Sequence, residues 1–220
     1  MFLQNILYLC LNKCLKMKSI LPVEEAESIL NVHFDVIAKC INDGFEDCQG
    51  FISEWNRNKK PINFEKRTIA NLVHDFIKER VKDQYSQIEN VETKEFNKIF
   101  GLHIDKKFLI RFKKINADFT TSNIKTKQTR NFEKQAEIEG LPKQATFLYA
   151  GYIPNPTWTS IKDIFIMCKS GGNVIWVKNL TSFAEQTQFT FESVETATTK
   201  QPSRIKVKVA EKKETGTDKH

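Results

Sequence analysis

The chain has 220 residues, 40% of them hydrophobic, which is enough to bury the core of one good-sized domain. Seventeen Phe residues against eight Gly and six Pro exclude a low-complexity chain. Thirty-four basic and 27 acidic side chains give a net charge of +7, which favours nucleic acid or an acidic protein as partner without distinguishing them.

Residues 1–21 are interpreted as an N-terminal extension. Their apolar run is too short to span a bilayer, and it lacks the leading positive charge and the cleavage site of a secretory signal. Met17 opens a segment that reads like a natural start, so residues 1–16 are expected to lie upstream of the true start. We therefore expect a cytoplasmic protein without a membrane partner.

The five cysteines contain no Cys-x-x-Cys spacing, and the four histidines complete no zinc-finger pattern. We interpret the cysteines as reduced thiols. The sequence thus predicts neither a metal site nor a cofactor.

Residues 22–90 predict a helical layer. A first helix starts after Pro22 and is expected to end at Gly44, and a shorter apolar stripe around Trp55 closes in a basic loop at 56–61. A second long helix is expected over about 63–85. The apolar positions of the first helix are spaced by three and four residues: Ile29, Val32, Val36, Ile37, Cys40 and Ile41.

Residues 94–182 predict a mostly antiparallel sheet of about five strands, interrupted by a short basic helix at 129–138. Asp105-Lys106 and the paired glycines of Ser170–Asn173 are the expected hairpin turns. The expected strands are 96–104, 107–115, 145–153, 162–168 and 174–180.

Helices followed by such a sheet predict an α+β fold, with one domain over 22–190. Residues 191–220 are rich in Thr, Lys and Glu and predict a flexible basic tail. Within it, the alternation of Arg204–Val209 is compatible with an additional edge strand.

A basic segment between His103 and Lys134 is the first candidate site. Phe108, Phe112 and Phe119 lie among its cations. Alternation along the expected strand 107–115 predicts Phe108, Ile110, Phe112 and Lys114 on one face and Leu109, Arg111, Lys113 and Ile115 on the other. One strand face and the connection after it are expected to follow a phosphate backbone or to contact an acidic partner. The alternative is a solvated sheet face whose phenylalanines point into the core. The predicted contacts are Lys106, Lys107, Arg111, Lys113, Lys114, Lys125, Lys127 and Arg130.

Arg67 and His74 on the second long helix are the alternative, catalytic candidate. Seven residues are almost two helical turns, so both are expected on one stripe, opposite the apolar face. The pair resembles the Arg–His motif of HEPN ribonucleases, which implies assistance to attack of a ribose hydroxyl on phosphate. The other interpretation is a solvated helix face.

Trp158 follows Pro154 and Pro156 in a rigid loop. Its ring is expected either to face a ligand or to cover the core.

Several segments together resemble a family of uncharacterised bacterial proteins associated with mobile elements. The resemblance implies a gene neighbour of the helix-turn-helix and zinc-peptidase type, as in toxin-antitoxin or phage-defence pairs, and assigns no catalytic residue. The segments are FLIRFKKI at 108–115, TSNIKTKQ at 121–128, NFEKQ at 131–135, GLP at 140–142, AGY at 150–152 and VIWV at 174–177. We therefore predict a non-catalytic binding protein of such a module, with a small ribonuclease-like toxin as the alternative.

Overall fold

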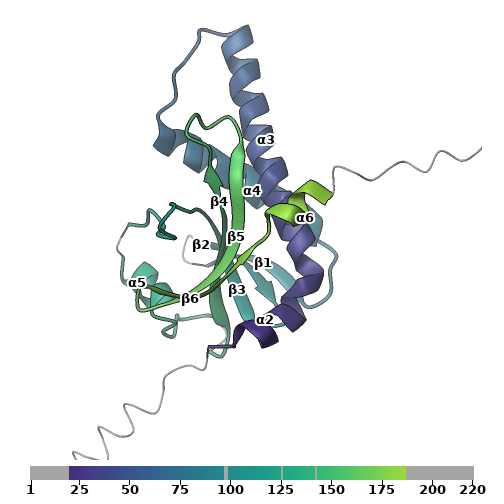
Figure 1. Ribbon diagram of the computed structural model, residues 1–220, viewed down its shortest axis with the longest axis vertical. Coiled ribbons are helices and arrows are strands. Elements are labelled where there is room, and N and C mark those ends of the chain that lie inside the picture. Colours follow the sequence, from purple (N-terminus) through teal and green to yellow (C-terminus); the bar gives the residue numbers. More distant parts are fainter. Residues whose placement is uncertain (1–19, 97–98, 125, 142, 187–220) are drawn as a thin grey trace, which may run out of the picture. The chain divides into compact units, whose positions relative to one another are not determined.

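The computed structural model describes residues 20–96, 99–124, 126–141 and 143–186 (Figure 1). Helices come first and strands second, so the expected α+β class is confirmed. The helices are α2 (Val23–Leu30), the 3-10 turn η1 (Asn31–His33), α3 (Phe34–Asn58), α4 (Lys66–Tyr85), α5 (Lys127–Glu133) and α6 (Thr181–Gln186). The strands are β1 (Val91–Phe96), β2 (Ile99–Ile104), β3 (Phe108–Lys114), β4 (Thr146–Pro154), β5 (Ile161–Ser170) and β6 (Asn173–Asn179).

The six strands form one sheet in the order of the sequence, β1 to β6. Every neighbouring pair is antiparallel except β3 and β4, which run parallel from Phe108 opposite Thr146 to Lys114 opposite Tyr152. Parallel neighbours cannot be joined by a tight turn, so the chain between them crosses the sheet and carries α5. The sheet is thus mostly antiparallel, as expected.

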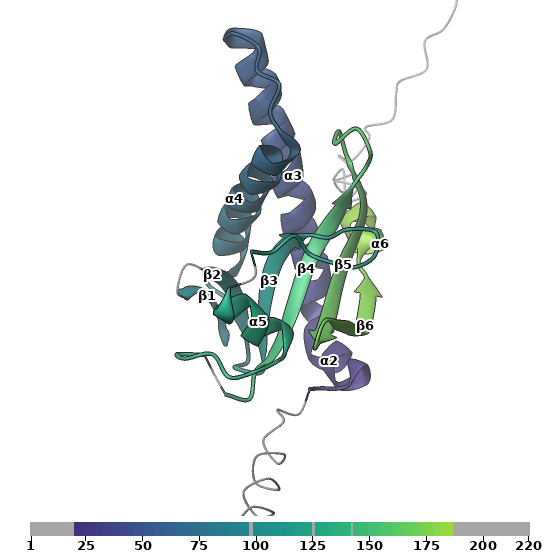
Figure 2. The same cartoon turned by 90° about the vertical axis from the view of Figure 1, so that its left-hand side faces the viewer.

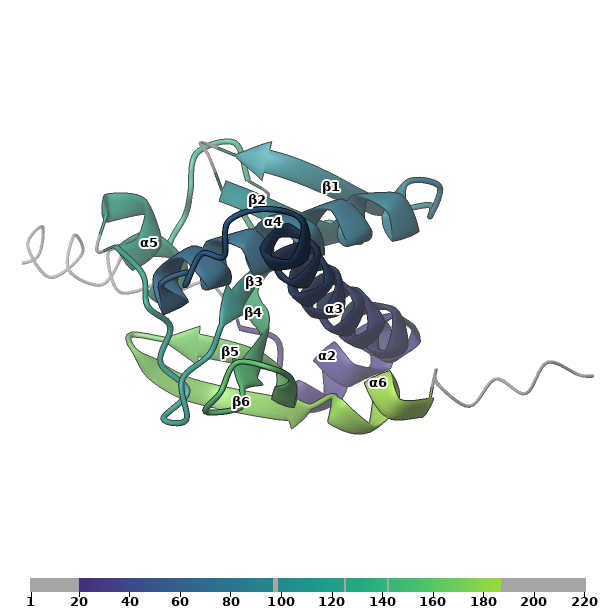
Figure 3. The same cartoon turned by 90° about the horizontal axis from the view of Figure 1, so that it is seen from above.

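The sheet is curved, and its two faces bury different parts of the chain. Helices α3 and α4 lie in the concave face, whereas α5 lies against the opposite face (Figures 2 and 3). On β3 the side chains of Phe108, Ile110 and Phe112 enter the core shared with the long helices, whereas Leu109 belongs to the smaller core beneath α5. The predicted alternation of this strand is therefore confirmed.

The helix that begins at Phe34 does not stop at Gly44, so that expected end was wrong. The helix continues to Asn58. Gly44 marks instead the place where α4 crosses α3, since a Cβ at residue 44 would lie 2.7 Å from the backbone nitrogen of Ile77. The glycine permits close packing of two helices and does not terminate one. A bidentate ion pair joins the same helices, with Arg80 Nε 2.6 Å and Nη2 2.8 Å from the carboxylate of Asp47.

Both predicted hairpin turns are confirmed. Asp105 and Lys106 have φ of 51° and 57°, and Gly171 and Gly172 have φ of 61° and 93°. These left-handed conformations match the tight turns that the sequence indicated.

The strand β1 and the helix α6 were missed. Three of the six residues of β1 are charged and it forms an edge of the sheet, so it lacks the apolar alternation that marks a strand. Six residues are too few to show helical periodicity in α6. The short basic helix lies at Lys127–Glu133 and ends earlier than expected, because Gln135 adopts a φ of 55°.

The buried side chain of Gln135 fixes the end of α5 to the sheet. Its Nε2 donates to the carbonyl oxygens of Phe147 (2.7 Å) and Lys169 (2.8 Å), and its Oε1 accepts from the Phe147 amide (2.8 Å). A side-chain amide that pairs with two strands in this way holds the whole crossover in place.

The predicted extension up to residue 19, the predicted tail from 191 and the possible strand Arg204–Val209 lie outside the described residues. Within the described part, no helix combines the length and the apolar character needed to cross a membrane.

The Gly44 contact predicts opposite effects for two alanine substitutions on α3. Gly44→Ala would push α4 away at Ile77 and is expected to lower the free energy of unfolding by about 1–3 kcal/mol. Gly50→Ala meets no atom within 4 Å and is expected to raise it by up to about 1 kcal/mol. Urea unfolding followed by circular dichroism measures both, and equal effects would contradict the proposed role of Gly44.

Candidate anion-binding cleft

A cleft of about 1120 Å³ opens between α4, the second half of β3 and the loop that leads into α5. We call it the α4–β3 cleft. Among the described residues that line it there is no Asp or Glu. Its basic and imidazole side chains are Lys66, Arg67, His74, Arg111, Lys113 and Lys114.

The cleft forms where β2 separates from β3. Strand β2 pairs with β3 only from Leu102 opposite Ile110 to Ile104 opposite Phe108. The rest of β3, Arg111–Lys114, keeps its pairing with β4. Along the edge of β3 that is not paired with β2, the strand is bordered by α4 and by the loop before α5. The cleft lies between this helix and this loop.

Arg111 is the most deeply buried cation of the cleft, with 7% of its surface exposed. Its guanidinium carbon lies 5.0 Å from the ring centroid of Phe132 and 5.8 Å from that of Tyr149. Burial lowers the pKa of Arg111, while Tyr149 and Glu133 oppose that shift. The Nη1 atom is buried and has no hydrogen-bond partner, which is unusual for a buried guanidinium.

The pKa values of His74 and Lys113 are both lowered by nearby positive charges. Burial, Lys113, Arg111 and Lys78 lower the pKa of His74 to about 4, against an opposing effect of Asp75. Burial and Arg111 lower the pKa of Lys113 as well. His74 Nδ1 is also buried without a partner. Perturbed titratable groups that gather in a concave site are typical of functional sites.

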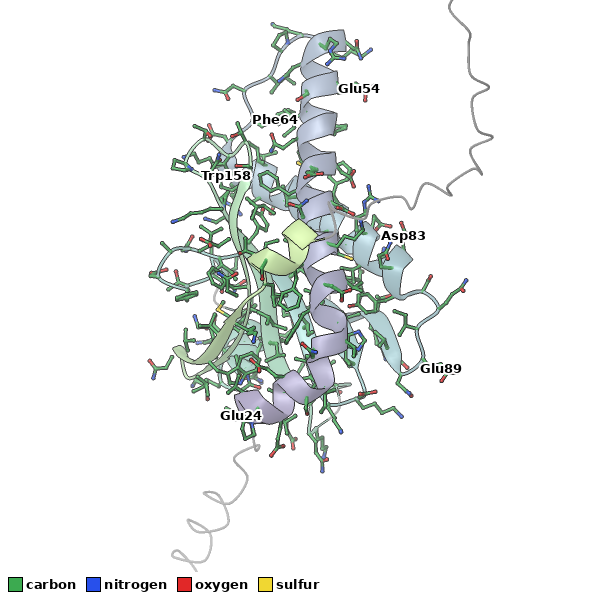
Figure 4. The ribbon with its side chains drawn as sticks, turned by 45° about the vertical axis from the view of Figure 1, so that its right-hand side comes forward. Glu24, Glu54, Phe64, Asp83, Glu89 and Trp158 are labelled. Atoms are coloured by element: carbon green, nitrogen blue, oxygen red, sulfur yellow. The ribbon has the colours of Figure 1, made fainter. Side chains whose placement is uncertain are left out.

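Two aromatic residues, Tyr152 and Trp158, line the cleft. Trp158 lies towards the same end of the protein as Phe64, opposite the end that carries Glu24 (Figure 4). Trp158 is 8% exposed, so its ring covers the protein interior and is not an open platform. Lys114 Nζ lies 5.7 Å from its ring centroid. The hydroxyl of Tyr152 is buried without a partner, and burial raises its pKa.

The structure brings together residues from both sequence candidates. Arg67 and His74 face the same cleft as Arg111, Lys113 and Lys114. Arg111 is buried and His74 is half-buried, so neither lies on the solvated face that the alternative interpretations describe.

The other predicted contacts lie elsewhere. Lys106 and Lys107 line a separate hollow at the β2–β3 turn, together with Glu92 and Asp105. Lys127 and Arg130 are exposed on α5 but do not line the cleft, and Lys125 lies outside the described residues.

Sequence reasoning missed Lys66 and Tyr152 as lining residues. Lys66 precedes Arg67 at the start of α4, and that adjacency could have indicated it. No sequence signal marks Tyr152, which lies opposite Lys114 in the parallel pairing of β3 with β4 and lines the cleft only in the folded chain.

No family model, curated protein or solved structure matches this chain. The two resemblances described above therefore stay predictions. Within the described residues, no three His, Cys, Asp or Glu side chains are grouped so that they could hold a metal ion.

The charges around His74 predict its titration. We expect a pKa near 4 by NMR of the imidazole, and a higher pKa in Lys113→Met, because Lys113 contributes the largest charge effect. Lys106→Met, at the distant turn, is the control and should leave that pKa unchanged. An unperturbed His74 in the wild type would contradict the described environment.

The same shift predicts how stability depends on pH. The folded state binds the His74 proton only near pH 4, whereas the unfolded chain binds it near pH 6.5, so stability falls as the pH drops through this window. The contribution is at most about 3 kcal/mol. The pKa values of His33 and His103 are lowered too, so these groups also make stability depend on pH. The contribution of His74 is the part of the stability difference between pH 4.5 and pH 7 that is lost in His74→Gln, as measured by urea unfolding.

Proposed function

We propose that this protein is a non-catalytic binding protein that takes single-stranded nucleic acid into the α4–β3 cleft. The observation that carries the proposal is the cleft lining: five lysines and arginines without a single carboxylate among the described lining residues. Phosphate groups are the ligands that complement such a lining.

The free energy of the empty cleft supports an anionic ligand. Cations that are removed from water without a carboxylate partner destabilise the folded protein. A bound phosphate would offset this cost at Arg111, Lys113 and the neighbouring lysines. The arrangement therefore costs stability in the free protein and is useful to it only when an anion is present.

The shape of the site favours a strand over an acidic protein. A stable protein interface buries roughly 800 Å² on each partner over a broad surface. Here the least exposed cations lie inside a cleft, where an extended strand or its end fits better than a folded surface. Lys127 and Arg130 are exposed on α5, beside the loop that borders the cleft, and offer further phosphate contacts outside it.

We further propose that the protein acts in the cytoplasm as one half of a toxin-antitoxin or phage-defence module. The support is the resemblance of the segments between residues 108 and 177 to a mobile-element family. Co-purification of the neighbouring gene product with the tagged protein tests this context, and its failure would remove the proposed pairing but not the binding site.

A small ribonuclease-like toxin is the second candidate function. It is favoured by one observation, that Arg67 and His74 line the same cationic cleft. A His74 that is neutral at pH 7 could accept the proton of a ribose hydroxyl. This candidate is supported if the wild-type protein cleaves single-stranded RNA and His74→Ala does not. It is ruled out if RNA incubated with the wild-type protein stays intact.

Two charge-matched double variants test nucleic-acid binding in the cleft. Lys66→Gln with Arg67→Gln removes two exposed cations from the cleft, and Lys106→Gln with Lys107→Gln removes two from the distant turn. In a salt series with single-stranded RNA, followed by fluorescence anisotropy, the first variant should reduce the log–log slope by about 1.4, because each phosphate contact contributes about 0.7.

The turn variant should keep the wild-type slope. Equal losses in both variants would indicate non-specific attraction to a basic protein. An absence of binding by wild type at low salt would overturn the proposed function.

A further inference from the structure

We propose that the deepest part of the α4–β3 cleft is a site for a terminal phosphate monoester, held by Arg111, Lys113 and His74. The inference rests on the proposed binding of nucleic acid and deepens it: the protein would recognise the phosphorylated end of a strand.

The three side chains come from two elements and line the same cleft, two as cations and His74 as a hydrogen-bonding imidazole. Arg111 and Lys113 are alternate residues of β3, and His74 faces them from α4. All three side chains line the same cleft, and the positive charges of Lys113 and Arg111 both lower the pKa of His74. We infer that a compact anion in this part of the cleft contacts all three.

Unmet hydrogen-bonding capacity points to a missing ligand at this place. Arg111 Nη1 and His74 Nδ1 are both buried and have no partner. Natural proteins leave few such groups unpaired, because each costs free energy. Arg111 is more than nine-tenths buried, and its Nη1 atom is among the buried atoms, so it does not lie at the exposed margin of the cleft.

The depth of the group favours a chain end over an internal phosphate. An internal diester carries one charge and continues on both sides, so the strand would have to enter and leave the buried region. A monoester carries up to two charges and three terminal oxygens, and only one side of it continues. It can thus satisfy a buried guanidinium and an ammonium group together.

The aromatic walls hold the guanidinium in place before the ligand arrives. Phe132 and Tyr149 contact Arg111 through their rings, and the Tyr149 hydroxyl lies 3.4 Å from Asn123 Nδ2, in the loop that lines the cleft. A side chain fixed in this way loses little conformational freedom on binding. Lys66 and Arg67 are exposed at the start of α4, where they can contact the phosphates that follow the bound end.

The test compares short RNAs of one sequence that differ only in their ends. Full-length protein is titrated with RNAs that carry a 5′-phosphate, a 3′-phosphate or hydroxyls at both ends, by fluorescence anisotropy at fixed salt. We expect one phosphorylated RNA to bind about tenfold tighter or more than the hydroxyl-ended RNA, as a charge-assisted contact implies. The comparison of the two phosphorylated RNAs shows which end enters the cleft.

Two neighbouring lysines provide matched variants. Lys113→Met should abolish the preference for a phosphorylated end. Lys114→Met also removes one positive charge, beside Trp158. It should lower the affinity for all three RNAs and preserve the preference for the phosphorylated end. Circular dichroism confirms that both variants are folded.

Titration with inorganic phosphate gives an independent readout. The imidazole NMR signals of His74 should shift in wild type, and much less in Lys113→Met. Equal affinity for all three RNAs would contradict the proposed site for a terminal phosphate. If the affinity still depended on salt, the proposed binding of nucleic acid in the cleft would be retained. An absence of RNA binding would overturn both.

Discussion

The parallel pairing of β3 with β4 is the constraint on which the other features depend. All remaining neighbours in the sheet are antiparallel and joined by short connections, but parallel strands require a crossover. That crossover supplies the loop from Ser122 to Thr126 and helix α5, which together form one wall of the α4–β3 cleft. It also sets Arg111 against Phe132, because α5 returns the chain over the face of β3 that carries the arginine.

The opposite wall depends on how closely α4 approaches the sheet. Gly44 allows the backbone of α4 to approach α3 at Ile77, and Arg80 pairs with Asp47 further along the same two helices. These contacts fix α4 against α3 just beyond His74, which lies about one turn before Ile77 on the same helix. The cationic site is thus built on rigid elements, and the packing of the helices compensates for the free energy that its unpaired charges cost.

Much of the fold was predictable, because apolar periodicity and turn chemistry act locally. The three- and four-residue spacing around Ile37 indicated a helix, and the glycines at 171 and 172 indicated a hairpin. The errors have local causes as well. Gly44 suggests a helix end unless the crossing of α4 is known, and β1 is an edge strand whose charged residues hide its alternation.

The sequence by itself determined the α+β class, the concentration of positive charge between His103 and Lys134, and the chemical types of the candidate residues. It could not show that Arg67 and His74 face Arg111 and Lys113, because these pairs lie more than 30 residues apart and meet only when α4 packs beside the free part of β3. The burial of Arg111 was likewise decided only by the tertiary structure. The alternation of β3 predicted which residues share a face, but the aromatic contacts of the folded chain decided that one of these faces buries an arginine.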